Sequence, residues 1–241
     1  MKALIFAAGL GERMRPLTDT TPKPLLAVAG KPLIVWHLEQ LAAMGIHDVA
    51  INTSWLARQF QPALGDGSQW GLRLHYSYEG NVPLETGGGM LHALQLLDID
   101  GDEAFIAVNG DIWTDYAFTK LPPSPAGNAH LVLVDNPAHN SNGDFALDAA
   151  GMVHSDREPR LTFSGIGVYR PGVLEGWRTV IGNTPGAACE PPRFGLAPLL
   201  RAAIQAGQVS GELHHGLWTD VGTPGRLREL DARLRRESAT R

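Results

Sequence analysis

The chain has one cysteine, Cys189, among its 241 residues, so neither an internal disulfide nor a cysteine-based zinc site is possible. It also has no long hydrophobic run. The first apolar stretch, residues 3–8, is too short for a membrane span or a secretion signal, and the acidic Glu12 soon follows. Positive charge is not in excess, because 20 Lys and Arg stand against 25 Asp and Glu. We therefore expect no nucleic-acid partner, no membrane contact and a cytoplasmic location.

The two commonest glycine-rich phosphate motifs are missing as well. The dinucleotide fingerprint G-x-G-x-x-G would need glycine at position 14, where the chain has Met14, and the Gly-Lys-Ser/Thr of the ATPase P-loop is absent. The loop after the first apolar stretch is nevertheless dense in groups that suit phosphate, namely Gly9, Gly11, Arg13, Arg15 and Lys23. Arg15 could equally be a salt-bridge partner. Local positive charge in an acidic chain favours a small anionic ligand over a polyanion.

Hydrophobic residues make up 44% of the chain, which is enough for a substantial core. Almost wholly apolar segments typical of buried parallel strands occupy residues 2–8, 49–52, 72–76, 104–108 and 131–135. Segments with helical spacing lie between them, at residues 32–44, 55–64 and 83–97. This alternation predicts an α/β fold with a single Rossmann-like, doubly wound sheet that is mixed but mainly parallel.

The pattern changes after residue 135. We expect a β-hairpin at 145–154, a strand at 161–169 and an irregular Pro/Gly-rich segment at 176–193. A helix at 196–206, strands at 209–213 and 217–221, and a charged helix at 224–237 follow. No linker is long enough to require two independent domains.

The opening loop also carries a longer pattern, formed by residues 9–18 (GLGERMRPLT), 22–25 (PKPL), Val28 and 31–32 (KP). This pattern resembles the signature of the sugar-nucleotide pyrophosphorylases, which are sugar-1-phosphate nucleotidylyltransferases. The resemblance continues at residues 109–111 (NGD) and 218–224 (WTDVGTP) and covers essentially the whole chain. It implies the nucleotide-diphospho-sugar transferase fold as one domain over residues 1–241. Residues 1–135 would mainly bind nucleotide, and residues 136–241 would supply the hairpin-bearing sugar site and a second metal aspartate.

Four further segments resemble one branch of this family, which transfers uridylyl from UTP to N-acetylmuramate α-1-phosphate in peptidoglycan sugar recycling. They are residues 84–89 (LETGGG), 108–116 (VNGDIWTDY), 130–137 (HLVLVDNP) and 143–145 (GDF). Guanylyltransferases that act on mannose 1-phosphate share some of these segments, and glucose 1-phosphate with UTP is a further alternative. A catalytically silent nucleotide-sugar sensor would be a different class of protein.

The resemblance implies roles for individual residues. Arg13 would contact the leaving phosphates and Lys23 the region of the α-phosphate, and these two are the expected catalytic residues. The expected nucleotide contacts are Ala8, Gly9, Gly11, Glu12, Arg13, Lys23, Glu79, Leu84, Glu85, Thr86, Gly87 and Asn109. The expected sugar contacts are Asn109, Asn142, Gly143, Asp144, Ser164 and Gly165.

Asp111 and Asp220 match the family's metal-binding aspartates. Each follows an apolar strand, and Mg²⁺ needs only one or two carboxylates because it keeps several waters. Mg²⁺ is therefore the expected cofactor. Asp115 is a competing candidate, but its position favours the N-cap of a short helix. A sensor would have no need to keep both metal carboxylates, so their presence favours an enzyme.

The chain departs from the family pattern at two places. Many relatives carry Glu-Lys-Pro before the strand at 161–169, whereas residues 157–160 read REPR and put Glu158 at the lysine position. Arg157 or Arg160 could compensate and could meet the lactyl carboxylate of muramate. Glu85 stands where many relatives have glycine. Because the helix at 224–237 is too charged for a large buried interface, we expect a monomer or a weak homodimer.

Overall fold

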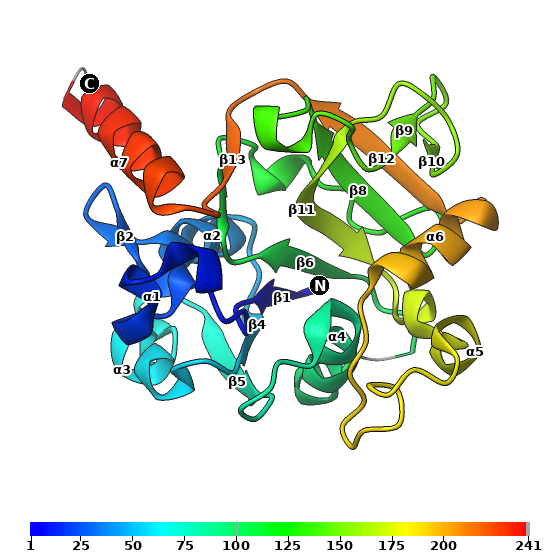
Figure 1. Cartoon of the computed structure of the whole chain (residues 1–241), viewed down its shortest axis with the longest axis horizontal. Helices are drawn as coiled ribbons and strands as arrows, with labels where there is room; N and C mark the ends of the chain where they lie inside the picture. Colours follow the sequence, from blue (N-terminus) through cyan, green and yellow to red (C-terminus); the bar gives the residue numbers. More distant parts are fainter. Residues whose placement is uncertain (100, 240–241) are drawn as a thin grey trace.

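The centre of the molecule is a seven-stranded sheet in the order β12-β8-β11-β6-β1-β4-β5 (Figure 1). The computed structural model describes residues 1–99 and 101–239. Four parallel strands form one half of the sheet: β1 (Lys2–Phe6), β4 (Asp48–Thr53), β5 (Arg73–Tyr78) and β6 (Phe105–Asn109). The other half comprises β8 (Ala129–Val134), the antiparallel β11 (Thr162–Tyr169) and β12 (Val209–His214). The predicted mixed, mainly parallel α/β sheet is confirmed.

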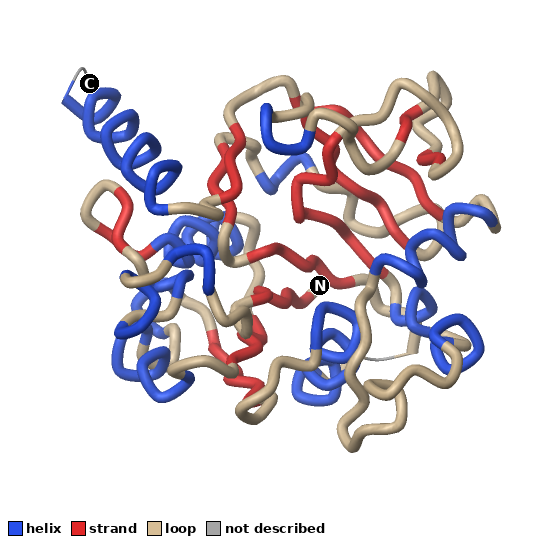
Figure 2. The backbone as a smooth tube through the Cα atoms, in the orientation of Figure 1, coloured by secondary structure: helices blue, strands red, loops and turns tan. Residues whose placement is uncertain are grey.

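Helices cover both faces of the sheet (Figure 2). They are α2 (Leu33–Ala43), α3 (Phe60–Leu64), α4 (Glu85–Leu97), α5 (Trp177–Ile181) and α6 (Ala197–Gln205). Alternate side chains of β1 enter different cores, since Ile5 packs in one with Leu38 of α2 and Leu4 packs in the other with Met90 of α4. Burial on both faces explains why β1 is apolar from Ala3 to Phe6.

Shorter elements fill the connections. The short helices are η1 (Glu12–Met14), α1 (Leu17–Thr20), η2 (Lys23–Leu25), η3 (Ala57–Gln59), η4 (Ser68–Trp70), η5 (Phe118–Lys120), η6 (Ala138–Asn140) and η7 (Pro171–Leu174). The short strands are β2 (Ala27–Val28), β3 (Lys31–Pro32), β7 (Ile112–Thr114), β9 (Ala146–Leu147), β10 (Val153–His154) and β13 (Trp218–Asp220). The antiparallel pairing of β9 with β10 confirms the predicted hairpin.

Three local predictions are wrong. Residues 55–64 do not form one helix: Leu56 takes a left-handed backbone (φ 51°), and the residues after it form η3 and then α3. The segment at 176–193 is not wholly irregular, since it begins with α5. Asp115 does not cap a helix: η5 starts three residues later, and the carboxylate of Asp115 accepts a hydrogen bond from the backbone N–H of Leu217 instead.

The last part of the chain returns to the opening loop. β13 pairs with β7, and the C-terminal helix α7 (Pro224–Ala239) starts four residues after β13 ends. Leu230 and Leu234 of α7 pack in a third core with Met14 of the opening loop and Trp113 of β7. The rest of α7 projects from the body of the molecule (Figure 1). In the part of the chain that the structure describes, no helix combines the length and apolar character that crossing a bilayer requires.

The order of the strands creates a topological switch point. The chain leaves β1 toward β4 on one side, whereas β6 lies on the other side of β1. Connections diverge at such a point and leave a crevice at the carboxyl ends of the two strands, where ligands of open α/β sheets bind. Here that crevice lies between the opening loop after β1 and the Asn109–Gly110–Asp111 segment, which begins with the last residue of β6.

Candidate active site

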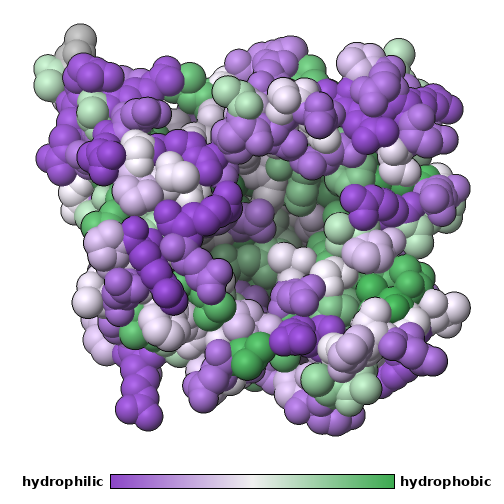
Figure 3. All heavy atoms as spheres, in the orientation of Figure 1, coloured by the Kyte–Doolittle hydropathy of each residue, from purple (hydrophilic) through white to green (hydrophobic). Residues whose placement is uncertain are grey.

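A cavity of about 620 Å³ lies at this switch point. Figure 3 shows the same face of the molecule hollowed between the opening loop and β11. Many of the predicted site residues line the cavity: Ala8, Gly9, Gly11, Glu12, Arg13, Lys23, Glu79, Glu85, Thr86, Asn109 and Asp111. The opening loop, the start of α4 and the end of β6 thus meet around one space.

The other predicted residues lie outside the cavity lining. They are Leu84, Gly87, Asn142, Gly143, Asp144, Ser164, Gly165 and Asp220. Eight lining residues were not among the site residues predicted from the sequence, namely Phe6, Ala7, Leu10, Met14, Pro24, Asn52, Pro83 and Gly222. Asn52 is the next-to-last residue of β4 and lies beside β1, a placement that depends on strand order and that its own sequence context does not signal.

The opening loop has a defined shape. Gly11 has a left-handed backbone (φ 66°), and a Cβ there would lie 2.8 Å from Cγ2 of Thr18. The Thr18 hydroxyl and the backbone N–H of Met14 both donate hydrogen bonds to the Gly11 carbonyl, each at 2.8 Å. Met14 is fully buried and anchors the loop in the third core. These contacts hold the backbone of residues 9–11 open toward the cavity.

The two arginines of the loop differ. Arg15 pairs with Asp19 at 3.3 Å, which agrees with the salt-bridge alternative. Arg13 is exposed, lines the cavity and makes no ion pair with any residue that the structure describes. Arg13 is therefore the loop's cation that is available to an anionic ligand.

Lys23 and Asp111 form an ion pair in the lining of the cavity. The side chain of Lys23 is only 10% exposed, and its Nζ lies 2.5 Å from Oδ2 of Asp111. Lys23 starts η2 and is fixed between Pro22 and Pro24. The pair places one positive and one negative charge beside the opening loop.

Asp220 approaches Asp111 through the pairing of β13 with β7. The backbone N–H of Val221 donates to the Asp111 carbonyl at 2.7 Å. The Asp220 carboxylate lies over Gly222, where a Cβ would be 2.9 Å from Oδ2, and Gly222 lines the cavity. Arg226 donates to the same carboxylate, and Nε2 of His139 lies 2.7 Å from its Oδ1.

The two carboxylates provide hard oxygen ligands that suit Mg²⁺. Within residues 1–99 and 101–239, no group of three or more His, Cys, Asp or Glu side chains could hold a metal ion unaided. Two carboxylates at the edge of a cavity fit a cation that completes its shell with water and phosphate oxygens. Lys23 and Arg226 balance the charges of Asp111 and Asp220 in this structure.

Asp115 fixes the strand that carries Asp220. Its Oδ1 accepts from the backbone N–H of Leu217 at 2.8 Å and lies 2.7 Å from Nε2 of His214. Gly216 passes between these groups, and a Cβ there would lie 2.4 Å from the same oxygen. Asp115 therefore orients the entry to β13 and is not a metal ligand in this arrangement.

Asn52 and Glu79 form a buried, hydrogen-bonded pair in the lining of the cavity. The Asn52 side chain accepts from the backbone N–H of Ala7 at 2.6 Å and donates to Oε1 of Glu79 at 2.6 Å. Oε2 of Glu79 accepts from the backbone N–H of Leu84 at 2.7 Å. Burial raises the pKa of Glu79, although the hydrogen bonds from Leu84 and Asn52 partly oppose it. This network joins β1, β4 and the approach to α4.

The glycines at the start of α4 pack against protein. The backbone N–H groups of Gly87 and Gly88 donate to the Phe194 carbonyl at 2.9 and 3.0 Å, and a Cβ on Gly87 would lie 2.6 Å from the Phe194 ring. The Phe194 N–H in turn donates to the Leu84 carbonyl at 3.1 Å. The small size of these glycines allows the close approach of the Pro/Gly-rich segment.

The predicted sugar-side residues gather around β11. The pairing of β11 with β8 shifts between Phe163 and Ile166, and Gly165 adopts φ 81° in this bulge. A Cβ on Gly165 would lie 2.5 Å from Nδ2 of Asn109, so the bulge makes room for that side chain. Asp144 accepts from the backbone N–H of Phe163 at 2.8 Å.

The flanking predicted residues lie nearby. Gly143 has φ 63° and packs on the backbone of Arg160, whereas Asn142 is exposed. Arg160 pairs with Glu158 at 3.1 Å, and Arg157 approaches Asp148 at 3.7 Å. In this structure, both arginines proposed as compensating cations therefore have acidic partners.

We expect Glu85→Gly to stabilise the protein. Glu85 opens α4 with a left-handed backbone (φ 61°), which costs a non-glycine residue about 1–2 kcal/mol. Glycine removes this strain but loses more chain entropy on folding, so the free energy of unfolding should rise by about 0.5–1 kcal/mol. Urea denaturation measures the change. Glu85→Ala keeps the strain and serves as the control; an equal rise in both variants would contradict the explanation.

We expect Glu79 to make stability depend on pH. Its pKa in the folded chain is raised above 4.5, so the folded state binds the proton more tightly than the unfolded state. The resulting stabilisation is fully present below about pH 4.5 and is lost as the pH rises through the raised pKa. Glu79→Gln cannot titrate. The free energy of unfolding of the native chain, relative to that variant, should fall over this range; a pH-independent difference would refute the assignment.

Comparisons with known proteins identify the family of the chain. Residues 2–153 match the family model described as Nucleotidyl transferase, and this match covers more than half of the chain. The chain therefore belongs to the nucleotidyl transferase family. The matched residues include the opening loop, the start of α4 and Asp111.

Named relatives define the class more closely. The chain is 48% identical, over 96% of its length and 97% of the relative, to N-acetylmuramate alpha-1-phosphate uridylyltransferase of Neisseria meningitidis. It is 33% identical to the protein of that name from Caulobacter vibrioides, with 96% of each chain covered. The expected membership among sugar-1-phosphate nucleotidylyltransferases is confirmed.

Solved structures share the fold. A Bacillus anthracis protein provisionally assigned as a glucose-1-phosphate thymidylyltransferase superposes with a TM-score of 0.77 at 23% identity, covering 98% of this chain and 95% of its own. HddC from Yersinia pseudotuberculosis gives 0.72 at 19% identity, with 97% and 99% covered. The predicted nucleotide-diphospho-sugar transferase fold is confirmed.

Proposed function

We propose that the protein transfers the uridylyl group of UTP to N-acetylmuramate α-1-phosphate, giving UDP-N-acetylmuramate and pyrophosphate. The observation that carries the proposal is the cavity at the switch point, which brings Arg13, Lys23 and Asp111 together next to the glycine-rich loop. The choice of base and sugar rests on the 48% identity to the Neisseria meningitidis uridylyltransferase, which covers nearly all of both chains.

The reaction would need charge stabilisation more than proton transfer. An oxygen of the sugar phosphate attacks the α-phosphorus of UTP, the bond from that phosphorus to the bridging oxygen breaks, and pyrophosphate leaves. The attacking oxygen is already anionic, so no general base is required. Arg13 would bind the leaving phosphates and Lys23 the α-phosphate, where negative charge accumulates.

Asp111 and Asp220 would hold a Mg²⁺ ion. When bound, the ion would neutralise phosphate charge and orient the reacting oxygens. The donor set supports this assignment, because two carboxylates leave coordination positions for water and phosphate oxygens. The cations that now balance these aspartates, Lys23 and Arg226, would then be free to pair with the anionic substrates.

Different residues around the cavity would bind the nucleotide and the sugar. The opening loop, Glu85 and Thr86 would surround the nucleotide, with Glu79 and Leu84 bracing that wall. The sugar would lie toward β11, near Asn109, Ser164 and Gly165, with residues 142–144 at its margin. In the cell, we propose a cytoplasmic enzyme of peptidoglycan sugar recycling that acts as a monomer or weak homodimer.

A panel of triphosphates and sugar 1-phosphates with Mg²⁺, followed by pyrophosphate release, tests the proposal. UTP with N-acetylmuramate α-1-phosphate should give the highest kcat/KM. No turnover with any pair would favour the nucleotide-sugar sensor. Turnover restricted to GTP and mannose 1-phosphate would favour the guanylyltransferase alternative, which matches relatives such as the Aspergillus fumigatus enzyme at 30% identity.

A further inference from the structure

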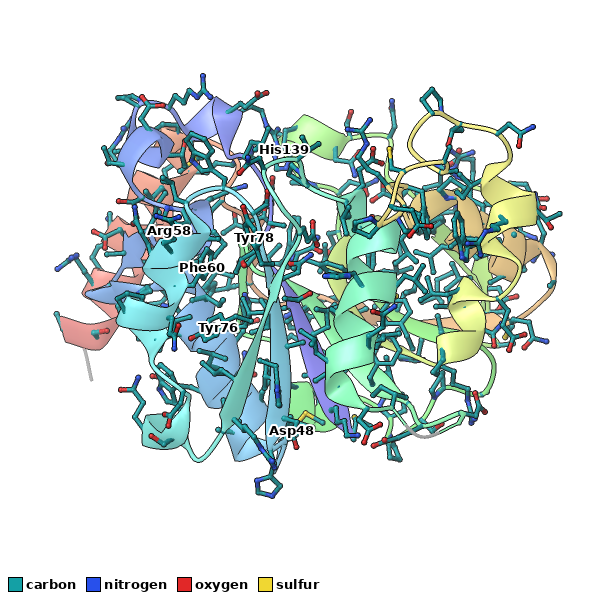
Figure 4. The ribbon with its side chains drawn as sticks, turned by 90° about the horizontal axis from the view of Figure 1, so that it is seen from below. Asp48, Arg58, Phe60, Tyr76, Tyr78 and His139 are labelled. Atoms are coloured by element: carbon teal, nitrogen blue, oxygen red, sulfur yellow. The ribbon has the colours of Figure 1, made fainter. Side chains whose placement is uncertain are left out.

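A second hollow of about 880 Å³ lies at the β5 edge of the sheet. None of its lining residues lines the active-site cavity. They are Thr53, Ser54, Leu56, Ala57, Arg58, Gln59, Gln61, Pro62, Tyr76, Tyr78 and Asn81. Figure 4 shows Arg58, Tyr76 and Tyr78 on this side of the molecule, from η3 and β5. This hollow has no role in the proposed reaction.

The lining of the hollow suits an anion. Arg58 is exposed and makes no ion pair with the described part of the chain. No Asp or Glu is among the lining residues, although the whole chain has a net charge of −5. An unpaired guanidinium without a neighbouring carboxylate favours phosphate or carboxylate, which it binds with two parallel hydrogen bonds.

The lining also suits a ring with hydroxyl groups. Tyr78 is 55% exposed, so its ring offers a face to a ligand. Tyr76 donates its hydroxyl to the Gly65 carbonyl at 2.6 Å, which fixes its ring against the hollow. The side-chain amides of Gln59, Gln61 and Asn81 can both donate and accept hydrogen bonds. A sugar or base that carries a phosphate combines all of these features.

The loop that forms one wall of the hollow is strained. Leu56 has φ 51°, a left-handed conformation that branched apolar residues rarely adopt. Its neighbours are tied down, since Ser54 donates to the Gly80 carbonyl at 2.6 Å. Strain of this kind persists where surrounding contacts impose it, and it is concentrated at ligand and switch sites.

The same wall contacts the nucleotide loop directly. Nε1 of Trp55 donates to the Thr18 carbonyl at 2.7 Å, and Nε2 of Gln59 donates to the Thr20 carbonyl at 2.8 Å. Thr18 in turn holds the carbonyl of Gly11 through its hydroxyl. A displacement of residues 54–59 therefore reaches Gly11 through two hydrogen-bonded steps.

We propose that this hollow is a regulatory site for a small phosphorylated ring compound, either a sugar phosphate or a nucleotide. Its phosphate binds Arg58, and its ring packs on Tyr78. Binding shifts residues 54–59 and, through Trp55 and Thr18, changes the affinity of the opening loop for the triphosphate. The site is distinct from the catalytic cavity and needs no residue of it.

Fluorine NMR of the full chain labelled with 5-fluorotryptophan tests the site, with Trp55→Phe used to assign the Trp55 resonance. Glucose 6-phosphate and uridine monophosphate are titrated separately in the presence of a saturating, non-hydrolysable UTP analogue that fills the catalytic cavity. We expect one probe to shift the Trp55 resonance with a Kd below about 1 mM. The probe that shifts this resonance shows whether the site takes a sugar phosphate or a nucleotide.

Arg58→Ala should weaken that binding by about 10-fold or more, because it removes a charge-assisted hydrogen bond. Arg73→Ala is the matched control, since Arg73 is an exposed arginine of β5 that pairs with Asp48 and lies outside the hollow. Tyr78→Ala provides a second, independent variant. No shift with either probe, or equal binding by Arg58→Ala and the native chain, would overturn the site.

Coupling is measured as the Kd of the UTP analogue with and without the bound probe. We expect a change of about 5-fold or more in the native chain and in Arg73→Ala, and no such change in Arg58→Ala. An unchanged Kd would overturn the regulatory role. Because both measurements are of binding, they do not depend on which sugar the enzyme accepts, so a failure here is distinguishable from a failure of the proposed reaction.

Discussion

Asp111→Asn is expected to lower kcat by about 10³-fold or more while the protein stays folded. Asparagine keeps the size of the side chain but removes the charge that would attract Mg²⁺, and the loss of a central electrostatic group has effects of this order. Asp111 is partly exposed and contacts Lys23, whose Nζ can donate to the amide oxygen instead. Steady-state kinetics across Mg²⁺ concentrations measure the loss of kcat. Thermal melting by circular dichroism shows whether the protein stays folded.

Asp220→Asn should give a loss of the same order, because the two carboxylates act on one ion. The double variant should then be little worse than either single one. Asp19→Asn is the control: Asp19, in α1, also pairs with a basic side chain, that of Arg15, but it does not line the cavity. Retained Mg²⁺-dependent turnover in Asp111→Asn would refute the metal assignment.

Lys23→Met is expected to lower kcat by about 10²–10³-fold with a smaller effect on KM for UTP. Methionine fills the space of the lysine stem, so the change removes the charge from a side chain that is only 10% exposed. A cation that stabilises charge gained in the transition state acts on kcat more than on ground-state binding. Single-turnover kinetics with saturating UTP measure the chemical step directly.

Lys31→Met provides the comparison. Lys31 lies over the Trp36 ring and pairs with Glu39, outside the cavity, so its replacement should leave kcat unchanged. If Lys23→Met raised KM for UTP and left kcat intact, Lys23 would bind the ground state and would not be catalytic. Loss of folding is not expected, because the partner Asp111 keeps access to solvent.

The first half of the fold could be predicted because its signals are local. Residues 3–8 are continuously apolar, and β1 is indeed buried on both faces. Gly45 follows the helical pattern of α2 and has the left-handed backbone (φ 77°) that ends a helix. The loop between β1 and α2 could be interpreted because its glycines and cations lie within a short stretch of chain.

The parts that the sequence did not reveal depend on long-range contacts. Asn52 becomes a cavity residue only because β4 lies beside β1, and Glu79 becomes a brace because Asn52 donates to it. The pairing of β7 with β13, which brings Asp220 to Asp111, joins segments more than a hundred residues apart. From the sequence, only the family resemblance indicated that Asp111 and Asp220 act together.

The glycines of α4 show the same limitation. Gly87 and Gly88 could be predicted as positions of close approach, but the sequence does not say what approaches them. The structure places Phe194 there, from a segment whose role the sequence left open. Likewise, the sequence offered Arg157 and Arg160 as possible cations for the sugar substrate. In the fold, each of them has an acidic partner.

The most direct test of the central claim is a competition in one vessel. UTP, GTP and dTTP are mixed with the α-1-phosphates of N-acetylmuramate, mannose and glucose, Mg²⁺ and the enzyme, and the nucleotide sugars are identified by mass spectrometry. We expect UDP-N-acetylmuramate as the dominant product, and we expect none of it from the Lys23→Met reaction over the same time. A different dominant nucleotide sugar, or none, would contradict the proposed function.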